Sequence, residues 1–179
     1  TEGTLDVGLA SDVSTIPYGS LVQVLREEEV FLAISMFHPY ALTHPSGTPI
    51  TAEEVKANFA GDNLLLSKKG ASLRMIGDQF FDACGFEPVA VCETNNISAT
   101  RSMVAQNAGV AFISESCSVN RNHIAYYPLS PAMKRLNLVV RQKDWVLNEP
   151  EQAFMDQILN YFKQNTEHPY LAEKYSISF

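Results

Sequence analysis

The chain of 179 residues has little of several features that would assign it to a class of protein. It has three cysteines (Cys84, Cys92 and Cys117), an odd number without a C-x-x-C pair, which favours reduced thiols over a disulfide framework. Its longest apolar run, residues 30–37, is strand-sized and far shorter than the about 18 residues that cross a bilayer. The formal net charge of −7 repels phosphate backbones, so this chain by itself is not expected to bind nucleic acid.

The sequence also lacks the common signatures of catalysis and of cofactor binding. It contains no G-x-S-x-G, no H-E-x-x-H, and no G-x-G-x-x-G or G-x-x-x-x-G-K-[ST] pattern. The four histidines are scattered along the chain, without a spacing typical of a metal site. We therefore expect no catalytic residues, no metal and no cofactor.

The pattern that is present is that of a globular α/β protein, in which strand-like apolar runs alternate with helix signals. Two strands are expected at residues 21–25 and 30–35, with the acidic run 26–29 between them as a solvated turn. Thr51 and Ser72 are each expected to cap a helix, and Gly85 to end the second of these. The other expected strands are residues 5–10, 63–66, 89–92, 110–113, 124–127 and 136–140, and the other expected helices are residues 97–106, 150–162 and 170–175.

Two turns that join a strand to the following helix stand out in the middle of the chain. Strands that alternate with helices indicate a mostly parallel sheet, and ligands bind at the carboxyl ends of such strands. The turns at residues 67–72 and 94–96 place hydroxyl or amide side chains beside the free N–H groups of a helix start, which suits an anion or a carboxylate. Ordinary helix capping is the alternative explanation, and the spacing leaves both interpretations open.

Five segments, taken in order, resemble the motifs of LysR-type transcriptional regulators. Residues 3–10 resemble G-x-L-D-x-x-L/I-A, and residues 25–41 resemble L-x-x-E-x-x-x-L followed by H-P-L-A. Residues 70–86 are similar to G-S-x-x-R with a later F-x-x-x-G-F, and residues 104–113 are similar to V-x-A-G-L-G-I-A-x-L-P. Residues 128–141 resemble the returning P-L…R-x-L-x-L-V-x-R segment, so the resemblance extends over most of the chain.

The resemblance implies the effector-binding domain of such a regulator, with a two-lobed α/β fold like that of type 2 periplasmic binding proteins. Lobe I would consist of residues 1–22 and 128–179, and lobe II of residues 23–127. The family's helix-turn-helix DNA-binding domain would precede Thr1 and is absent from this sequence. The first strand–helix–strand unit of the effector domain would precede it too, so lobe I is expected to be incomplete.

The resemblance also implies a small-molecule site between the lobes. By position in the family's motifs, the expected effector contacts are Ser11, Ser72, Thr94, Asn95, Asn96 and Ser114. Two residues depart from the motifs. Asn107 replaces a glycine, which is tolerable because Asn adopts the left-handed conformation, and Ser114 replaces a proline. Ser72 stands where the peroxide-sensing branch of the family has a reactive cysteine, so a sulfenic acid switch is not expected there.

These implications favour a cytoplasmic sensor that is not an enzyme. A small polar or carboxylate effector would bind between the lobes and shift the balance between their arrangements. The family implies a homodimer or tetramer, DNA contact only through the missing N-terminal domain, and no membrane contact. Two alternatives stay open: a solute-binding protein of a transporter with the same fold, and an enzyme in which Asp12, Glu93 and Glu115 converge.

Overall fold

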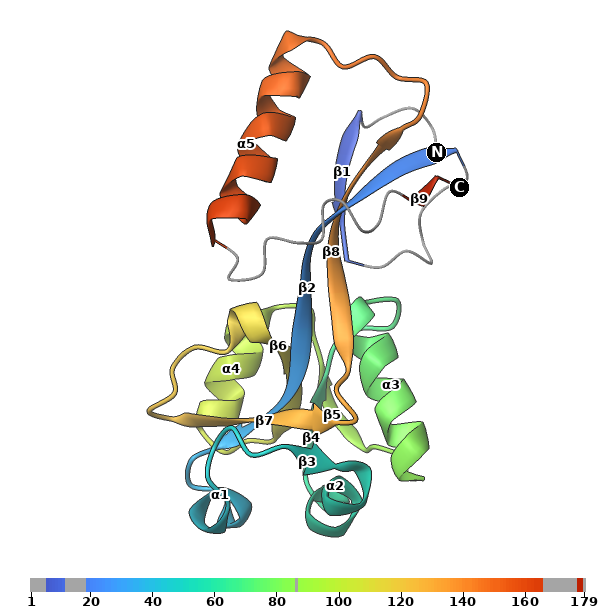
Figure 1. Cartoon of the computed structure of the whole chain (residues 1–179). Coiled ribbons are helices and arrows are strands. Elements are labelled where there is room, and N and C mark those ends of the chain that lie inside the picture. The colour runs from blue at the N-terminus through green and yellow to red at the C-terminus, as the bar shows by residue number, and fades with distance from the viewer. Residues whose placement is uncertain (1–5, 12–18, 86, 166–176, 179) are drawn as a thin grey trace. The chain divides into compact units, whose positions relative to one another are not determined.

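The computed structural model describes residues 6–11, 19–85, 87–165 and 177–178, and the other residues are drawn as a grey trace in Figure 1. The helix expected at residues 170–175 lies outside the described residues. Within the described ranges, no helix combines the length and the apolar character needed to cross a membrane.

The chain forms two compact units. The first unit consists of Thr1–Glu27 and Leu136–Phe179, and the second of Glu28–Arg135. The lobe boundaries implied by the resemblance, after residues 22 and 127, stay a prediction.

The first unit is a small sheet packed against one helix. β1 (Val7–Ala10) pairs antiparallel with β8 (Lys134–Gln142), and β9 (Ile177–Ser178) pairs antiparallel with β2 (Ser20–Ser35). α5 (Glu149–Asn165) places Met155 against Leu25 and Val139. The strong helix that the apolar spacing predicts near the end of the chain is therefore confirmed.

The second unit contains a mixed sheet with the strand order β3–β7–β2–β6–β4–β5. β4 (Leu64–Leu66), β5 (Ala90–Glu93) and β6 (Val110–Ser114) are parallel to one another. β2 pairs antiparallel with β6 on one side and with β7 (Ile124–Ser130) on the other, and β3 (Ile50–Thr51) is parallel to β7. The parallel arrangement expected from the sequence is thus confined to β4, β5 and β6, with β3 and β7 forming a separate parallel pair.

Helices connect these strands, and their ends follow local sequence signals with one exception. They are α1 (Pro39–Thr43), α2 (Ala52–Phe59), α3 (Ser72–Cys84), α4 (Ile97–Ala105) and the 3-10 helix η1 (Glu115–Cys117). Thr51 caps α2 as expected, because its Oγ1 accepts a hydrogen bond from the Glu54 N–H at 3.2 Å. The exception is Ser72: the N-cap of α3 is Ala71, so the expectation that Ser72 caps this helix is wrong.

Two residues with left-handed backbone conformations end helices at the expected places. Gly85 follows α3 with a φ of 67°, which suits a residue without a Cβ. Asn107, which stands at the glycine of the family motif, has a φ of 57°. The expectation that asparagine replaces glycine there by adopting the left-handed conformation is confirmed.

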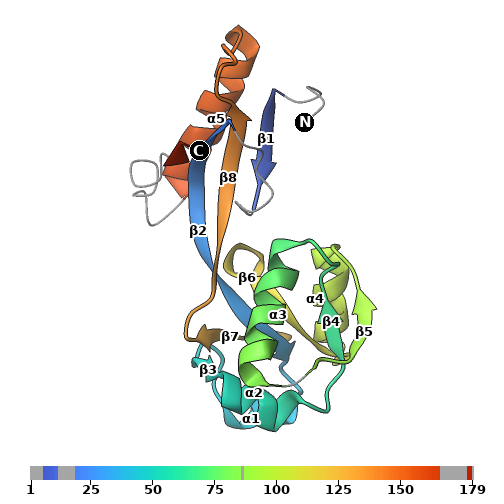
Figure 2. The same cartoon turned by 90° about the vertical axis from the view of Figure 1, so that its right-hand side faces the viewer.

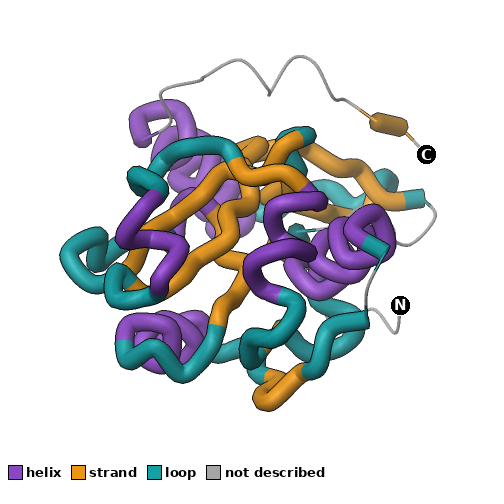
Figure 3. The backbone as a smooth tube through the Cα atoms, turned by 90° about the horizontal axis from the view of Figure 1, so that it is seen from below, coloured by secondary structure: helices purple, strands orange, loops and turns teal. Residues whose placement is uncertain are grey.

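The side chains of β6 alternate between two hydrophobic clusters on opposite faces of the sheet. Val110 and Phe112 belong to the cluster that contains residues of α3, and Ala111 and Ile113 belong to the cluster that contains Val104 of α4. Figures 1 and 2 show α3 and α4 on opposite sides of these strands, and Figure 3 gives the view from below with helices in purple and strands in orange.

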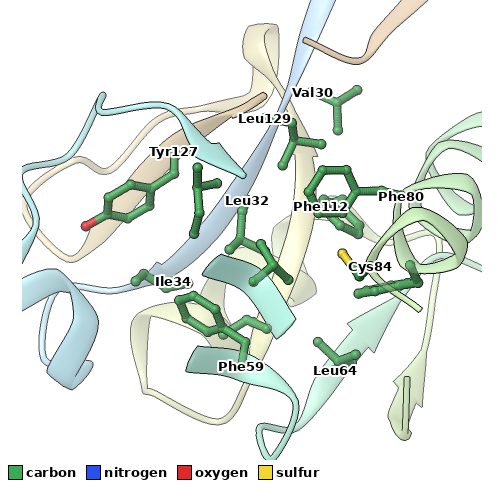
Figure 4. Packing of buried hydrophobic residues seen from close by; sticks show 14 of the residues in the cluster. Val30, Leu32, Ile34, Phe59, Leu64, Phe80, Cys84, Phe112, Tyr127 and Leu129 are labelled. Atoms are coloured by element: carbon green, nitrogen blue, oxygen red, sulfur yellow. The ribbon is translucent and has the colours of Figure 1, made fainter. Parts of the chain in front are cut away.

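The packing between α3 and β6 is close. The ring centroid of Phe112 lies 5.7 Å from that of Phe80 and 5.2 Å from that of Phe81, and Figure 4 shows the cluster around these rings. A Cβ at Gly77 would lie 2.9 Å from a ring carbon of Phe112, so only glycine permits this approach without a shift. This contact packs α3 against the middle of β6.

The acidic run at residues 26–29 is not the solvated turn expected from the sequence. It lies inside β2, which continues without interruption for 16 residues. Glu28 is 1% exposed and follows the two-residue period of Val30 and Leu32, which places these three side chains on one face of the strand. The expectation was wrong because Glu28 accepts hydrogen bonds from Ser116 and Arg135 inside the fold.

Candidate functional site

The carboxyl ends of three parallel strands form the candidate site, because each is followed by a turn into a helix. Ser72 lies beyond β4 at the first residue of α3, and Thr94, Asn95 and Asn96 fill the turn from β5 to α4. Ser114 is the last residue of β6. The remaining expected contact, Ser11, follows directly after β1 in the other unit.

The two turns that the sequence singled out contact one another. Asn95 Oδ1 accepts a hydrogen bond from the Lys68 N–H at 3.0 Å. The Thr94 N–H donates to the Leu66 carbonyl oxygen at 2.9 Å, which continues the pairing of β4 with β5 into the turns. The turn after β4 and the turn after β5 are therefore joined by hydrogen bonds at the carboxyl edge of the sheet.

Two of the expected contact residues accept hydrogen bonds from nearby main-chain N–H groups. Asn96 Oδ1 accepts hydrogen bonds from the Ser98 and Ala99 N–H groups, both at 3.1 Å, and so caps α4. Thr94 Oγ1 accepts from the Asn96 N–H at 3.1 Å. The capping interpretation therefore describes what these two oxygens do in this structure, and their contact with an effector stays a prediction.

Ser114 differs from these residues because its hydroxyl is buried without a partner. The residue is 1% exposed, and its Oγ has no hydrogen-bond partner in the part of the chain that the structure describes. Ser114 lies two residues after Phe112, so it shares the sheet face that α3 covers.

The start of α3 lies level with this hydroxyl. Two residues of strand advance about 7 Å beyond Phe112, and four residues of helix back from Gly77 cover about 6 Å, so we infer that the first turn of α3 lies near Ser114. That first turn has no side-chain cap and no acidic residue. The positive end of the α3 dipole favours an oxygen acceptor at this edge, as does the unpaired Ser114 hydroxyl.

Arg74, also in the first turn of α3, is held by other side chains. Its Nη1 donates to Glu93 Oε1 at 2.7 Å and its Nε donates to Asp78 Oδ1 at 2.8 Å. These hydrogen bonds, first the one to Glu93, raise the pKa of Arg74. Glu93, one of the carboxylates considered for an enzyme, is therefore engaged in holding α3 against β5.

Of the other two residues considered for catalysis, only Glu115 belongs to the described part of the chain. Glu115 is exposed in η1, and Asp12 lies outside the described residues. No group of three or more His, Cys, Asp or Glu side chains that could hold a metal ion occurs in the described ranges. Burial raises the pKa of the Cys84 thiol, which agrees with the packing role of this residue in the core.

The sequence interpretation named Glu28 only as the glutamate of the L-x-x-E-x-x-x-L motif, placed it in a solvated turn, and so missed its buried partners. Its Oε1 accepts a hydrogen bond from Arg135 Nε at 2.6 Å, and its Oε2 accepts from the Ser116 N–H at 3.0 Å. Burial alone would raise the pKa of Glu28, but the hydrogen bonds from Ser116 and Arg135 and the charge of Arg135 outweigh it and lower the pKa. Glu28 lies two residues before Val30, and this alternation with period two could have indicated that Glu28 is a buried strand residue.

Comparisons with known proteins agree with this architecture. The family model of the LysR substrate binding domain matches residues 1–163. A curated relative, the uncharacterized HTH-type transcriptional regulator YybE of Bacillus subtilis (strain 168), is 25% identical over 141 residues, which cover 78% of this chain and 46% of that protein. The chain thus spans about half the length of this relative.

Solved structures share the fold at low sequence identity. The regulatory domain of CcmR from Synechocystis PCC6803, solved with 2-PG, has a TM-score of 0.72 at 18% identity and covers 89% of this chain and 74% of that one. The effector-binding domain of QuiR with shikimate has a TM-score of 0.70 at 17% identity, with 90% and 73% covered. The reduced OxyR regulatory domain from Pseudomonas aeruginosa has a TM-score of 0.67 at 20% identity, with 90% and 74% covered.

Proposed function

The chain belongs to the LysR substrate-binding domain family, and we propose that it is the ligand-sensing part of a longer transcriptional regulator. A small polar or carboxylate effector binds at the carboxyl edge of β4, β5 and β6 and alters the regulator's effect on transcription. DNA is contacted only through a helix-turn-helix domain outside this sequence. The whole protein acts in the cytoplasm as a homodimer or tetramer.

The observation that carries the proposed site is the buried hydroxyl of Ser114. Nearly all buried polar groups in folded proteins have a hydrogen-bond partner. A buried polar group that lacks one lowers the stability of the protein by about 1–3 kcal/mol. An effector oxygen at this edge supplies the partner, and the positive end of the α3 dipole favours the same oxygen. The Arg74 guanidinium at this helix start is held by hydrogen bonds from its Nη1 to Glu93 and from its Nε to Asp78.

The regulator is favoured over the two alternatives. The matching family consists of binding domains of transcriptional regulators, and the curated relative is an HTH-type regulator rather than a transporter component. An enzyme would need a catalytic group at this edge, whereas Glu93 is bound to Arg74 there.

Thermal melting of the chain with a compound panel tests the proposal. The panel contains shikimate, which QuiR binds, 2-PG, which CcmR binds, and aromatic acids, amino acids and sulfur metabolites. A specific ligand raises the melting temperature further as its concentration increases. At a ligand concentration of one hundred times Kd, the free energy of unfolding increases by about 2.7 kcal/mol. A flat response across the panel would contradict an effector site in this chain.

Ser114→Ala separates the proposed site from any other binding. The variant should lose most of the ligand-induced shift, and without ligand it should be at least as stable as the wild type because a buried unpaired hydroxyl is removed. Ser102→Ala, which removes an exposed hydroxyl on α4, is the matched control and should respond like the wild type. An unchanged ligand affinity in Ser114→Ala would exclude this hydroxyl from the site.

A further inference from the structure

Two strands, β2 and β8, run through both units, and their boundary residues are joined by an ion pair. Glu28 in β2 is the first residue of the second unit, and Arg135 in β8 is its last. The Arg135 guanidinium donates to Glu28 Oε1 at 2.6 Å, and the Glu28 side chain is fully buried. This pair therefore ties the two strands together at the point where both leave the second unit.

The second oxygen of Glu28 reaches the candidate site. The ladder between β2 and β6 ends at the pair Val30 and Ser114, and its continuation would place Glu28 opposite Ser116. The chain turns into η1 instead, and the Ser116 N–H donates to Glu28 Oε2 at 3.0 Å. Beyond the end of the ladder, the Ser116 N–H is therefore bound by the Glu28 carboxylate instead of by a main-chain carbonyl of β2.

The geometry points to a connected arrangement rather than two separate contacts. Glu28 and Val30 share one face of β2, and Val30 lies directly opposite Ser114. A displacement of Ser114 moves the Ser116 N–H, which is bound to one Glu28 oxygen, while Arg135 is bound to the other. Because the carboxylate is rigid, the loop at residues 114–117 and the two strands cannot shift independently without breaking one of these hydrogen bonds.

We propose that Glu28 is a positioning residue that sets the place of Ser114 and couples effector binding there to strands β2 and β8. This inference rests on the proposed function for its effector, but the coupling itself exists without a ligand. Both carboxylate oxygens are needed. Glutamine has one acceptor oxygen, so in Glu28→Gln its NH2 group faces either the Ser116 N–H or the Arg135 Nε–H, and one link is lost.

Hydrogen exchange of the chain without ligand tests the coupling. In the described part of the chain, Glu28 accepts hydrogen bonds from both Arg135 and Ser116 of η1, so Arg135→Gln should speed exchange at residues 115–118 if Glu28 transmits the change. Conversely, Ser116→Pro, which removes the N–H, should speed exchange in β8. We expect an acceleration of about tenfold or more at these amides, and the same at residues 115–118 in Glu28→Gln.

Two controls separate positioning from general loss of stability. Glu29→Gln removes a charge from the next residue of β2, on the opposite face, and should leave these rates unchanged. Exchange in the β5 segment, residues 90–93, serves as an internal reference and should also stay unchanged. Equal acceleration at residues 90–93, or wild-type exchange at residues 115–118 in Arg135→Gln, would overturn the proposal.

The same variants test the consequence for binding. With any panel compound that stabilises the wild type, Glu28→Gln should weaken affinity at least about fivefold and Glu29→Gln should not change it. If no compound binds, the proposed function fails while the exchange measurements still decide the coupling. If a compound binds with equal affinity to wild type and Glu28→Gln, Glu28 does not position the site.

Discussion

The different exposure of Glu28 and Arg135 predicts which of the two single alanine variants loses more stability. The Glu28 side chain is 0% exposed, whereas that of Arg135 is 18% exposed. In Arg135→Ala the carboxylate is left charged and buried, which costs about 3–5 kcal/mol. In Glu28→Ala the guanidinium can reach water and the Ser116 N–H loses its acceptor, so we expect about 2–3 kcal/mol.

The double variant Glu28→Ala with Arg135→Ala should cost less than the sum of the single variants. It removes the unpaired charge that dominates each of them, so we expect a coupling energy of about 2 kcal/mol. Urea unfolding of the four proteins at pH 7 measures these differences, provided that the m-value is unchanged. Single-variant costs that add within about 0.5 kcal/mol, or a larger loss in Glu28→Ala than in Arg135→Ala, would refute the reasoning.

The pH dependence of the same pair has a definite sign. The folded state lowers the pKa of Glu28, so its contribution to stability is present above the ordinary glutamate value of about 4.3 and is lost as the pH falls through the folded-state pKa. The loss of stability in Arg135→Ala relative to the wild type should be smaller at pH 4 than at pH 7, because protonation of Glu28 removes the unpaired buried charge. Unfolding at the two pH values measures this difference, and an equal loss at both would contradict it.

Two further variants test local packing and capping by the same unfolding measurements. Thr51→Ala removes the hydroxyl that caps α2 and should cost about 1 kcal/mol, whereas loss of less than 0.3 kcal/mol would show that the capping box is not needed. Gly77→Ala places a Cβ about 2.9 Å from the Phe112 ring and should destabilise by about 1–2 kcal/mol despite the better helix propensity of alanine. Phe112→Leu combined with Gly77→Ala should recover part of that loss, and a stabilised Gly77→Ala single variant would show that the ring moves freely.

Local sequence signals were sufficient for much of the fold, because the responsible interactions lie within a few residues of one another. The capping box joins Thr51 and Glu54, which are three positions apart, and the left-handed ends at Gly85 and Asn107 depend on single residues. The turns at residues 67–72 and 94–96 were likewise recognised from strand and helix patterns. Their contact through Asn95 and Lys68 follows from the parallel order of β4 and β5.

The sequence by itself determined the α/β pattern, most helix ends and the position of the candidate edge, since these depend on short-range periodicity and capping. Only the tertiary structure decided that the acidic run is part of a continuous strand. Glu28 is stabilised by Arg135, which is 107 residues away along the chain, and by a main-chain N–H at the end of another strand. A buried charge depends on partners that the fold brings together, and no local pattern of residues contains them.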